Sequence, residues 1–542
     1  MIKEKINKLI GRIQSNLTKK KILLILIIFF IVGSILRING LGFGFPLILH
    51  PDEEHITREA VRMASTGNLE PQVYNRPDHT TIYLNAFLYR IFSIIKYQNS
   101  DEKMNIQHLY NNNRSSYIYA SRFITAIFGS LMILSMFFLG KEIGGEKVGL
   151  FSSFFTAFFP SFIHHSHFVT SDILLAFFAS LVALYTCKYM KRRKVKFLFI
   201  GCIFCGLATS VKYPGLITTI MIASAVIFIH WPRKTKILKL GVSSFLVYFT
   251  SLFLVTPYLF LNYKATYKLL VFESCSYHLG VPELGWGKKL LYYLDVFHNN
   301  MGTFLFILFI FSVLLIFIEF KKYILIKKYY LSIFLFGVTY WVLMSKVGLH
   351  WERWAVPMYI VPLIVVSMGI HYLSRHLKTG VIYIFYVLLC IIFLSFIFRG
   401  LYQSLDPLEP NTQNISRVWI NENLPKDAKL VGDGYSPILP GRPYSVAEKS
   451  IKQYKEDGVD YVVVSSSMYE RYLKEKNKYP KETKFYQDLF EKEKLIKYFS
   501  PTYLKIGRND LLAIYKIINY ILDIVKNKKV FLNGPHIKIY KL

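Results

Sequence analysis

The chain has 542 residues, of which 53% are hydrophobic and 17% aromatic, and its mean hydropathy is +0.33. This composition is too apolar for an ordinary soluble protein, and the apolar residues gather in runs close to the roughly 20 residues that a membrane span needs. A net charge of +32 would suggest nucleic-acid binding in a soluble protein. Here the Lys and Arg residues cluster between the apolar runs and are not interleaved with aromatic residues. We therefore predict an integral membrane protein that does not bind nucleic acid.

About eleven apolar runs have the length and composition of membrane spans. The basic segment 1–21 precedes the first run, and no small-residue cleavage site follows it, so we predict a retained signal anchor. The predicted spans are 22–38, 117–140, 148–165, 169–187, 197–211, 214–230, 239–259, 302–320, 329–346, 354–373 and 380–399.

The connections between these runs fall into two alternating sets. One set is short and strongly basic, as at 188–196 and 233–239, whereas the other includes a long loop at 39–116 in which acids balance the bases. By the positive-inside rule the basic set is cytoplasmic. We therefore expect a multi-pass protein of the cell membrane with its N-terminus inside and its C-terminus outside, and a transmembrane catalytic domain over residues 1–400.

The chain becomes more polar after residue 400. Segments 428–432 and 459–464 have the pattern of short strands, and 448–457 and 467–476 have the pattern of helices. Strands alternating with helices predict a small extracytoplasmic α/β domain over 401–542. The predicted fold class is thus mainly α, a polytopic transmembrane helical bundle carrying this domain. The domain shows no phosphate-binding loop, nucleophile elbow or metal-ligand spacing.

Three consecutive carboxylates, Asp52, Glu53 and Glu54, follow the first predicted span. Charge is costly beside a membrane, so the cluster predicts a functional site on the external side. Pro51 and Asp52 would begin an amphipathic helix that continues over 56–68, and the alternative is that Asp52 only caps this helix. Its apolar face would contain Ile56, Ala60, Met63 and Ala64.

Further polar groups share the predicted external side. Acids together with cations there suit a polar lipid substrate with a phosphate, which needs a base and charges that hold the phosphate. The alternative for the cations is anchoring to lipid headgroups. His164, His165 and His167 lack the i,i+4 spacing of zinc-peptidase helices, so hydrogen bonding is favoured over a metal. The candidate substrate-binding residues are His55, Arg76, Asp172, Lys212, His350 and Arg353.

Several short motifs resemble those of the GT-C-type integral membrane glycosyltransferases, in particular the branch of protein O-mannosyltransferases and the lipid A aminoarabinose transferase. Each motif is weak by itself, and their order and sidedness make the resemblance specific. The motifs are Pro51-Asp52-Glu53 after the first span, Thr170-Ser171-Asp172 at the start of a span, Gly206-Leu207-Ala208 before Lys212-Tyr213, His350 to Arg353 before a Pro-containing span, and Trp419 to Pro425 and Asp460 to Ser465 in the C-terminal part.

The resemblance implies a hexosyl- or pentosyltransferase that moves a sugar from a polyprenyl-phosphate-sugar to an extracytoplasmic acceptor, which would be a cell-envelope glycan, a lipid or a protein. It implies Asp52 as the general base of an inverting reaction, Glu53 as its support and Asp172 on the acceptor side. Beyond the lipid-phosphate-linked sugar it implies no certain cofactor and no metal, and it implies a membrane groove for the polyprenyl tail.

One departure from the family pattern leaves the phosphate ligand open. Arg76-Pro77-Asp78 stands where several relatives carry Lys-Pro-Pro. The candidates for binding the phosphate are therefore Arg76, Lys212, His350 and Arg353.

Two other classes of function remain as alternatives. A transporter or flippase of a lipid-linked sugar would use the same charges without bond cleavage, although the clearest acids lie near span ends rather than mid-span. An inactive paralogue would use the C-terminal domain to bind a partner, although Asp52, Glu53 and Asp172 are all present.

Overall fold

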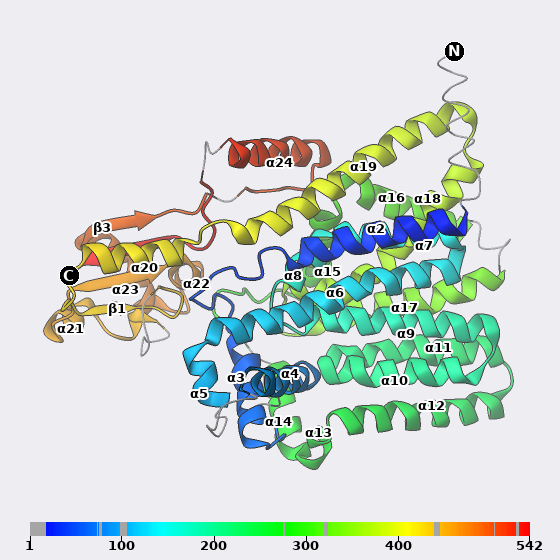
Figure 1. The fold of residues 1–542 in the computed structure, drawn as a ribbon, viewed down its shortest axis with the longest axis horizontal. Helices are drawn as coiled ribbons and strands as arrows, with labels where there is room; N and C mark the ends of the chain where they lie inside the picture. Colours follow the sequence, from blue (N-terminus) through cyan, green and yellow to red (C-terminus); the bar gives the residue numbers. More distant parts are fainter. Residues whose placement is uncertain are drawn as a thin grey trace.

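The computed structural model describes residues 18–72, 74, 78–97, 106–274, 277–318, 324–437, 445–502, 504–526 and 530–542. Long helices run in nearly the same direction and form a bundle, and a small sheet lies beyond one end of it (Figure 1). We call the end of the bundle nearest the sheet the site end. This architecture confirms the part of the predicted fold class that concerns a mainly helical bundle with a small sheet.

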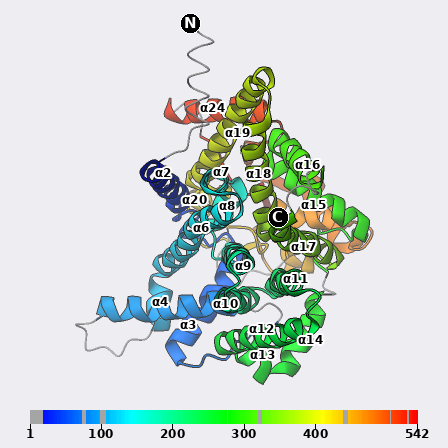
Figure 2. The same cartoon turned by 90° about the vertical axis from the view of Figure 1, so that its right-hand side faces the viewer.

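The first part of the bundle is built from helices with almost wholly apolar interiors. In the most apolar 18-residue stretch of α9, 83% of the residues are buried, whereas in that of α12 only 22% are buried. Helix α9 therefore lies at the centre of the bundle and α12 at its edge. Figure 2 shows the same arrangement end-on. The elements of this part are α2 (Lys19–Ile38), α6 (Arg114–Gly144), α7 (Glu146–Phe158), α8 (Pro160–Ser166), α9 (Asp172–Arg192), α10 (Val195–Val211), η1 (Tyr213–Thr218), α11 (Thr219–His230) and α12 (Lys234–Val255).

The second part of the bundle follows a set of shorter helices. Its main elements are α16 (Thr303–Ile318), α17 (Ile324–Lys346), η3 (Glu352–Tyr359), α18 (Ile360–His376) and α19 (Thr379–Leu405). The shorter helices, which gather towards the site end, are α3 (Pro51–Thr66), α4 (His79–Tyr97), α5 (Ile106–Asn112), α13 (Tyr258–Leu261), α14 (Tyr263–Ser274) and α15 (Trp286–Met301).

Seven of the described helical segments are long and apolar enough to cross a membrane, and eight if the bent pair α15 and α16 counts as one span. That pair turns by 118° at Gly302, whose φ of +75° suits glycine. Within the described residues, helices lie at each of the eleven positions predicted as spans, but some are short or broken. For example, α7 gives way to α8 at Pro160, because proline has no N–H for the helix. The count of eleven spans stays a prediction.

Helix α3 positions the acidic cluster. Pro51 occupies its first turn, the His50 ring accepts a hydrogen bond from the Asp52 N–H at 3.2 Å, and Gly67 in the left-handed conformation ends it. The cap is therefore His50, and the alternative in which Asp52 is the cap is wrong. The apolar face is confirmed, since the four predicted residues are all buried, namely Ile56, Ala60, Met63 and Ala64.

The C-terminal part contains a four-stranded sheet of order β1-β2-β4-β3. The sequence predicted β1 and β2, which pair in parallel, but not β3 and β4, which pair antiparallel with each other, and β4 with β2. Alternate residues of β2 point into different cores: Val462 and Val464 face α22 and α23, and Val463 packs on the α20 side. The elements are η4 (Asp406–Leu408), α20 (Thr412–Asn423), β1 (Leu430–Gly432), η5 (Val446–Glu448), α21 (Ile451–Glu456), β2 (Tyr461–Ser465), α22 (Ser466–Lys474), α23 (Pro480–Lys492), β3 (Lys494–Phe499), α24 (Asp510–Val525) and β4 (Ile537–Lys541).

Side-chain hydrogen bonds join the C-terminal part to the bundle. The Arg399 side chain of α19 donates to the Gly507 carbonyl at 2.9 Å, and the Asn414 side chain donates to the Gly44 carbonyl at 3.0 Å. Helix α19 itself runs five residues beyond the domain boundary predicted at residue 400. Chain segments on both sides of that boundary therefore build one continuous structure at the site end.

Candidate active site

Asp52 lies at the start of α3 and forms an ion pair with Arg353 of η3. Only 13% of the Asp52 side chain and 22% of the Arg353 side chain are exposed. Fixed geometry and little water make such a pair much stronger than a surface pair. The fold thus brings a predicted base and a predicted phosphate ligand, 301 residues apart, into direct contact.

Glu53 points in a different direction and is fully buried. Its carboxylate accepts two hydrogen bonds from Arg122 of α6, at 2.8 and 2.7 Å, and one from the Val169 N–H at 3.0 Å. Arg122 is equally buried. Since both oxygens of Glu53 are engaged, this residue fixes α3 against α6 and the segment before α9.

Arg122 is a residue that the sequence analysis missed. It also donates to the carbonyls of Leu41 and Phe43, at 2.7 and 2.8 Å, and its guanidinium lies 3.7 Å from the Phe43 ring centroid. The chain entering α3 is thereby held as well. The available signal was a cation inside a predicted span, which by itself marks a structural or functional partner.

A second ion pair joins α9 to the segment after α10. Lys212, which lies in extended conformation between α10 and η1, donates to Asp172 Oδ1 at 2.6 Å. Asp172 is 1% exposed, and its Oδ2 is buried without a hydrogen-bond partner in the described structure. The pairing of these two predicted residues brings an acid and a cation together at the site end.

The two ion pairs belong to one electrostatic cluster. Arg353 forms its ion pair with Asp52, and it also lies within the electrostatic field of Asp172 and Asp78. The Ser171 hydroxyl donates to Asp78, which directly precedes α4. The charges of three carboxylates from three separate segments therefore act on one guanidinium.

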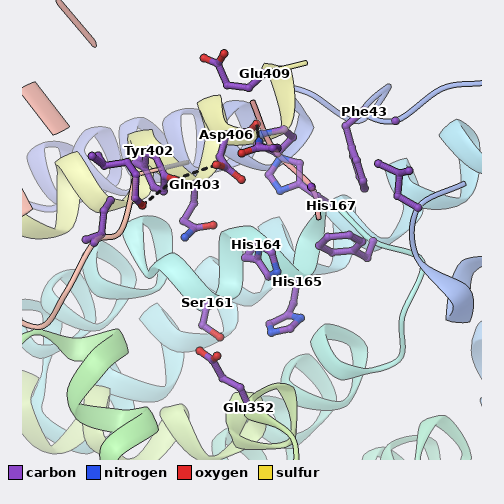
Figure 3. Close-up of a pocket in the computed structure, with 18 of the residues that line it drawn as sticks. Phe43, Ser161, His164, His165, His167, Glu352, Tyr402, Gln403, Asp406 and Glu409 are labelled. Atoms are coloured by element: carbon purple, nitrogen blue, oxygen red, sulfur yellow. Dashed lines mark hydrogen bonds between the residues drawn. The ribbon is translucent and has the colours of Figure 1, made fainter. Parts of the chain in front are cut away.

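A cavity of about 870 Å³ opens beside this cluster, and Arg353 is part of its wall. Figure 3 shows His164, His165 and Glu352 on one side and Tyr402, Gln403, Asp406 and Glu409 on the other. The C-terminal part closes the cavity with residues that local patterns did not predict. These are Leu504, Lys505, Ile506, Asn533 and Gly534.

Carboxylates make this cavity wall suitable for hydroxyl groups. Tyr402 Oη lies 3.0 Å from Asp406 Oδ1, and the Tyr520 hydroxyl donates to Glu409 at 2.9 Å. Burial, with a further contribution from the Asp406 charge, raises the pKa of Glu409 above its usual value. The Asn300 amide donates to Glu352 at 2.8 Å. Side chains of this kind orient a polyhydroxyl ligand through fixed hydrogen bonds.

His50 supports Asp52 as a neutral imidazole. Burial lowers its pKa below 6.5, although the neighbouring charges of Asp52 and Glu53 act in the opposite direction. A neutral ring agrees with Nδ1 accepting from the Asp52 N–H, which leaves the proton on Nε2.

His350 lies apart from the cavity wall. Its ring packs on Tyr292, with 4.8 Å between the ring centroids, and burial together with the Lys289 charge lowers its pKa. In this state it is a neutral hydrogen-bonding group, not a cation for a phosphate. His55 is half-buried on α3, and Arg76 lies outside the described residues.

The three histidines in and directly after α8, His164, His165 and His167, contact other parts of the protein. His167 lies 2.8 Å from the carbonyl oxygens of both Ile163 and Asn39. Among the described residues, no group of three or more His, Cys, Asp or Glu is arranged to hold a metal ion. His164 and His165 instead line the cavity.

Comparisons with known proteins agree on the kind of molecule. The model of the dolichyl-phosphate-mannose-protein mannosyltransferase family matches residues 89–271. A search of the curated proteins found no match.

Solved structures with a similar fold cover most of the chain. ArnT from Cupriavidus metallidurans in the apo state is 13% identical with a TM-score of 0.51, over 84% of this chain and 94% of that chain. ArnT was also solved bound to undecaprenyl phosphate, with 12% identity and a TM-score of 0.50 over 84% of this chain and 95% of that one. The archaeal oligosaccharyltransferase AglB from Archaeoglobus fulgidus, in complex with an inhibitory peptide and a dolichol-phosphate, is 14% identical with a TM-score of 0.51, over 89% of this chain and 74% of that chain.

These similarities confirm the resemblance that the motifs predicted. The chain resembles the GT-C-type membrane glycosyltransferases in sequence over 89–271 and in fold over most of its length.

Proposed function

We propose that this protein transfers a sugar from a polyprenyl-phosphate-sugar to a hydroxyl of an extracytoplasmic acceptor, with inversion and with Asp52 as general base. The observation that carries the proposal is the Asp52–Arg353 ion pair at the edge of a cavity whose wall contains several carboxylates. In this proposal Asp52 is the proton acceptor and Arg353 is the cation beside it, and the reaction needs both groups close to the substrate.

The donor phosphate would bind to Arg353, with Lys212 as a second cation. Among the similar structures, ArnT was solved bound to undecaprenyl phosphate and AglB in complex with a dolichol-phosphate, which supports a polyprenyl phosphate as the donor group here. A phosphate at Arg353 would compete with Asp52 for the guanidinium. Donor binding would thereby release the Asp52 carboxylate for the acceptor.

In the transfer step, Asp52 takes the proton of the acceptor hydroxyl while its oxygen attacks the anomeric carbon. The bond from this carbon to the phosphate oxygen breaks, and its electron pair leaves with the polyprenyl phosphate. Arg353 and Lys212 stabilise the charge that grows on the departing oxygen. Attack from the side opposite the phosphate inverts the anomeric carbon.

The proposal includes the predicted topology. The site end, with the sheet of residues 430–541, would face the outside of the cell membrane, and the basic connections would face the cytoplasm. The acceptor would then be a cell-envelope glycan, a lipid or a protein, bound in the cavity between the bundle and the C-terminal part.

Replacing Asp52 with Asn tests the base directly. We expect the rate of sugar transfer in membranes to fall by roughly 10²- to 10⁴-fold. The assay measures the free polyprenyl phosphate that is released from each member of a panel of polyprenyl-phosphate-sugars. Glu54→Gln is the matched control, because Glu54 belongs to the same helical turn but forms only exposed ion pairs with Arg58 and Arg114. Undiminished transfer by Asp52→Asn would exclude Asp52 as base. If the wild-type protein moves the intact lipid-linked sugar across the membrane and releases no free polyprenyl phosphate, the function is transport and not sugar transfer.

A further inference from the structure

Helix α24 (Asp510–Val525) has two apolar faces. One face is buried against the rest of the protein through Ala513, Ile517 and Tyr520. The opposite face is exposed and lies at helical spacing of three and four residues. It contains Leu511, Tyr515, Ile518, Leu522 and Val525, which are 56%, 65%, 37%, 43% and 73% exposed.

The polar residues of α24 form a narrow strip between these faces. Lys516, Asn519, Asp523 and Lys526 recur at spacings of three and four residues along one flank. A helix that buries one apolar face in its own protein normally presents a polar face to water. The exposed apolar face of α24 therefore indicates that this face contacts an apolar surrounding.

The position of α24 identifies that surrounding. Figure 1 shows it alongside α19, and the contacts agree, since Tyr402 and Tyr520 stack edge to face with 5.3 Å between ring centroids. At its N-terminal end, Asp510 accepts hydrogen bonds from Ser395 of α19 at 2.7 Å and from the Phe304 N–H of α16 at 2.8 Å. Both α16 and α19 belong to segments with the composition of membrane spans.

These contacts set the depth of the helix. Phe304 lies at the beginning of α16, and Ser395 lies ten residues, roughly 15 Å of helix, before the end of α19. Both spans also carry exposed apolar residues within two helical turns of Phe304 and Ser395. On these neighbours they are Ile307, Ile310, Phe311 and Leu394.

We propose that α24 is a lipid-binding helix that inserts its exposed apolar face into the leaflet at the site end and anchors the C-terminal part there. Its partner is a bilayer surface: acyl chains contact Leu511, Tyr515 and Ile518, and Lys516 and Lys526 on the polar flank lie at the headgroups. Basic residues beside an apolar face are typical of helices that lie in a membrane interface.

Photocrosslinking in nanodiscs of phosphatidylethanolamine and phosphatidylglycerol tests this proposal on the full chain. Benzoylphenylalanine replaces Tyr515, and in a matched variant it replaces Tyr498, which is 44% exposed on β3. We expect lipid adducts, detected by mass spectrometry, to be at least tenfold more abundant at position 515 than at position 498. A third variant at Asn519 on the polar strip should give an intermediate yield.

Equal lipid labelling at positions 515 and 498 would overturn the proposal. An adduct between two copies of the chain at position 515, in place of lipid, would also overturn it and would make this face a protein interface. Because the readout is an adduct, its result does not depend on sugar transfer.

Discussion

The regions on the two sides of α3 both contain a carboxylate paired with an arginine, but the pairs differ in what they leave available. On the side of α3 that contacts α6, Glu53 and Arg122 are fully buried, and the carboxylate accepts three hydrogen bonds. On the side of α3 that contacts η3, Asp52 and Arg353 are partly exposed, and Arg353 borders a cavity. A pair with no exposed atoms can only hold the fold together, whereas a pair beside a cavity can exchange partners when a substrate arrives.

Breaking the buried pair should give the largest effect on stability. Glu53→Ala leaves the Arg122 charge buried without its partner, which costs about 3–5 kcal/mol of folding free energy. Thermal unfolding in detergent, followed by loss of the monodisperse protein, measures this. A change as small as that of Glu54→Ala, which loses only exposed ion pairs, would contradict the structural role.

Breaking the pair beside the cavity should affect catalysis more than folding. Arg353→Ala removes the proposed phosphate ligand, and we expect kcat/KM for the lipid-linked donor to fall by roughly 10²- to 10³-fold. The control is Arg58→Ala, because the Arg58 side chain is 69% exposed and its ion pair within the described part of the chain is with Glu54, across one helical turn. If both variants retain the same activity, the comparison between the two regions fails.

A smaller effect is expected where the C-terminal part contributes to the cavity wall. Tyr520→Phe removes the 2.9 Å hydrogen bond to Glu409 but keeps the packing against Tyr402. The expected loss of stability is about 0.5–1.5 kcal/mol. Unfolding curves of the variant and the wild type at the same pH measure it, and a loss several times larger would mean that packing also changed.

The smallest expected effect concerns the pH dependence of stability. Burial raises the pKa of Glu409 in the folded protein above 4.5, so its charged form opposes folding. The stabilising contribution of this group is complete below the unfolded pKa and is lost as the pH rises through the folded pKa. Glu409→Gln should therefore raise Tm relative to wild type at pH 7 but not at pH 4. An equal difference at both pH values would argue against titration of Glu409.

The sequence by itself determined the features that depend on local periodicity and composition. The apolar runs predicted an integral membrane protein, and the spacing of Ile56, Ala60, Met63 and Ala64 predicted the buried face of α3. Short motifs such as Pro51-Asp52-Glu53 predicted the family resemblance that the comparisons confirmed. Helix propensity, hydropathy and motif order all lie within a few neighbouring residues, so they are present in the chain before it folds.

Only the tertiary structure decided which of these residues meet. Asp52 and Arg353 are 301 positions apart, Glu53 and Arg122 are 69, and Asp172 and Lys212 are 40. Their pairing follows from how the helices pack, and packing depends on the shapes of all side chains at once. The same holds for the cavity wall, where residues 402–409 meet residues 504–506 and 533–534. A charge pattern identified the candidate groups, but only the packed helices separate the carboxylate that holds α3 from the one that lies beside the cavity.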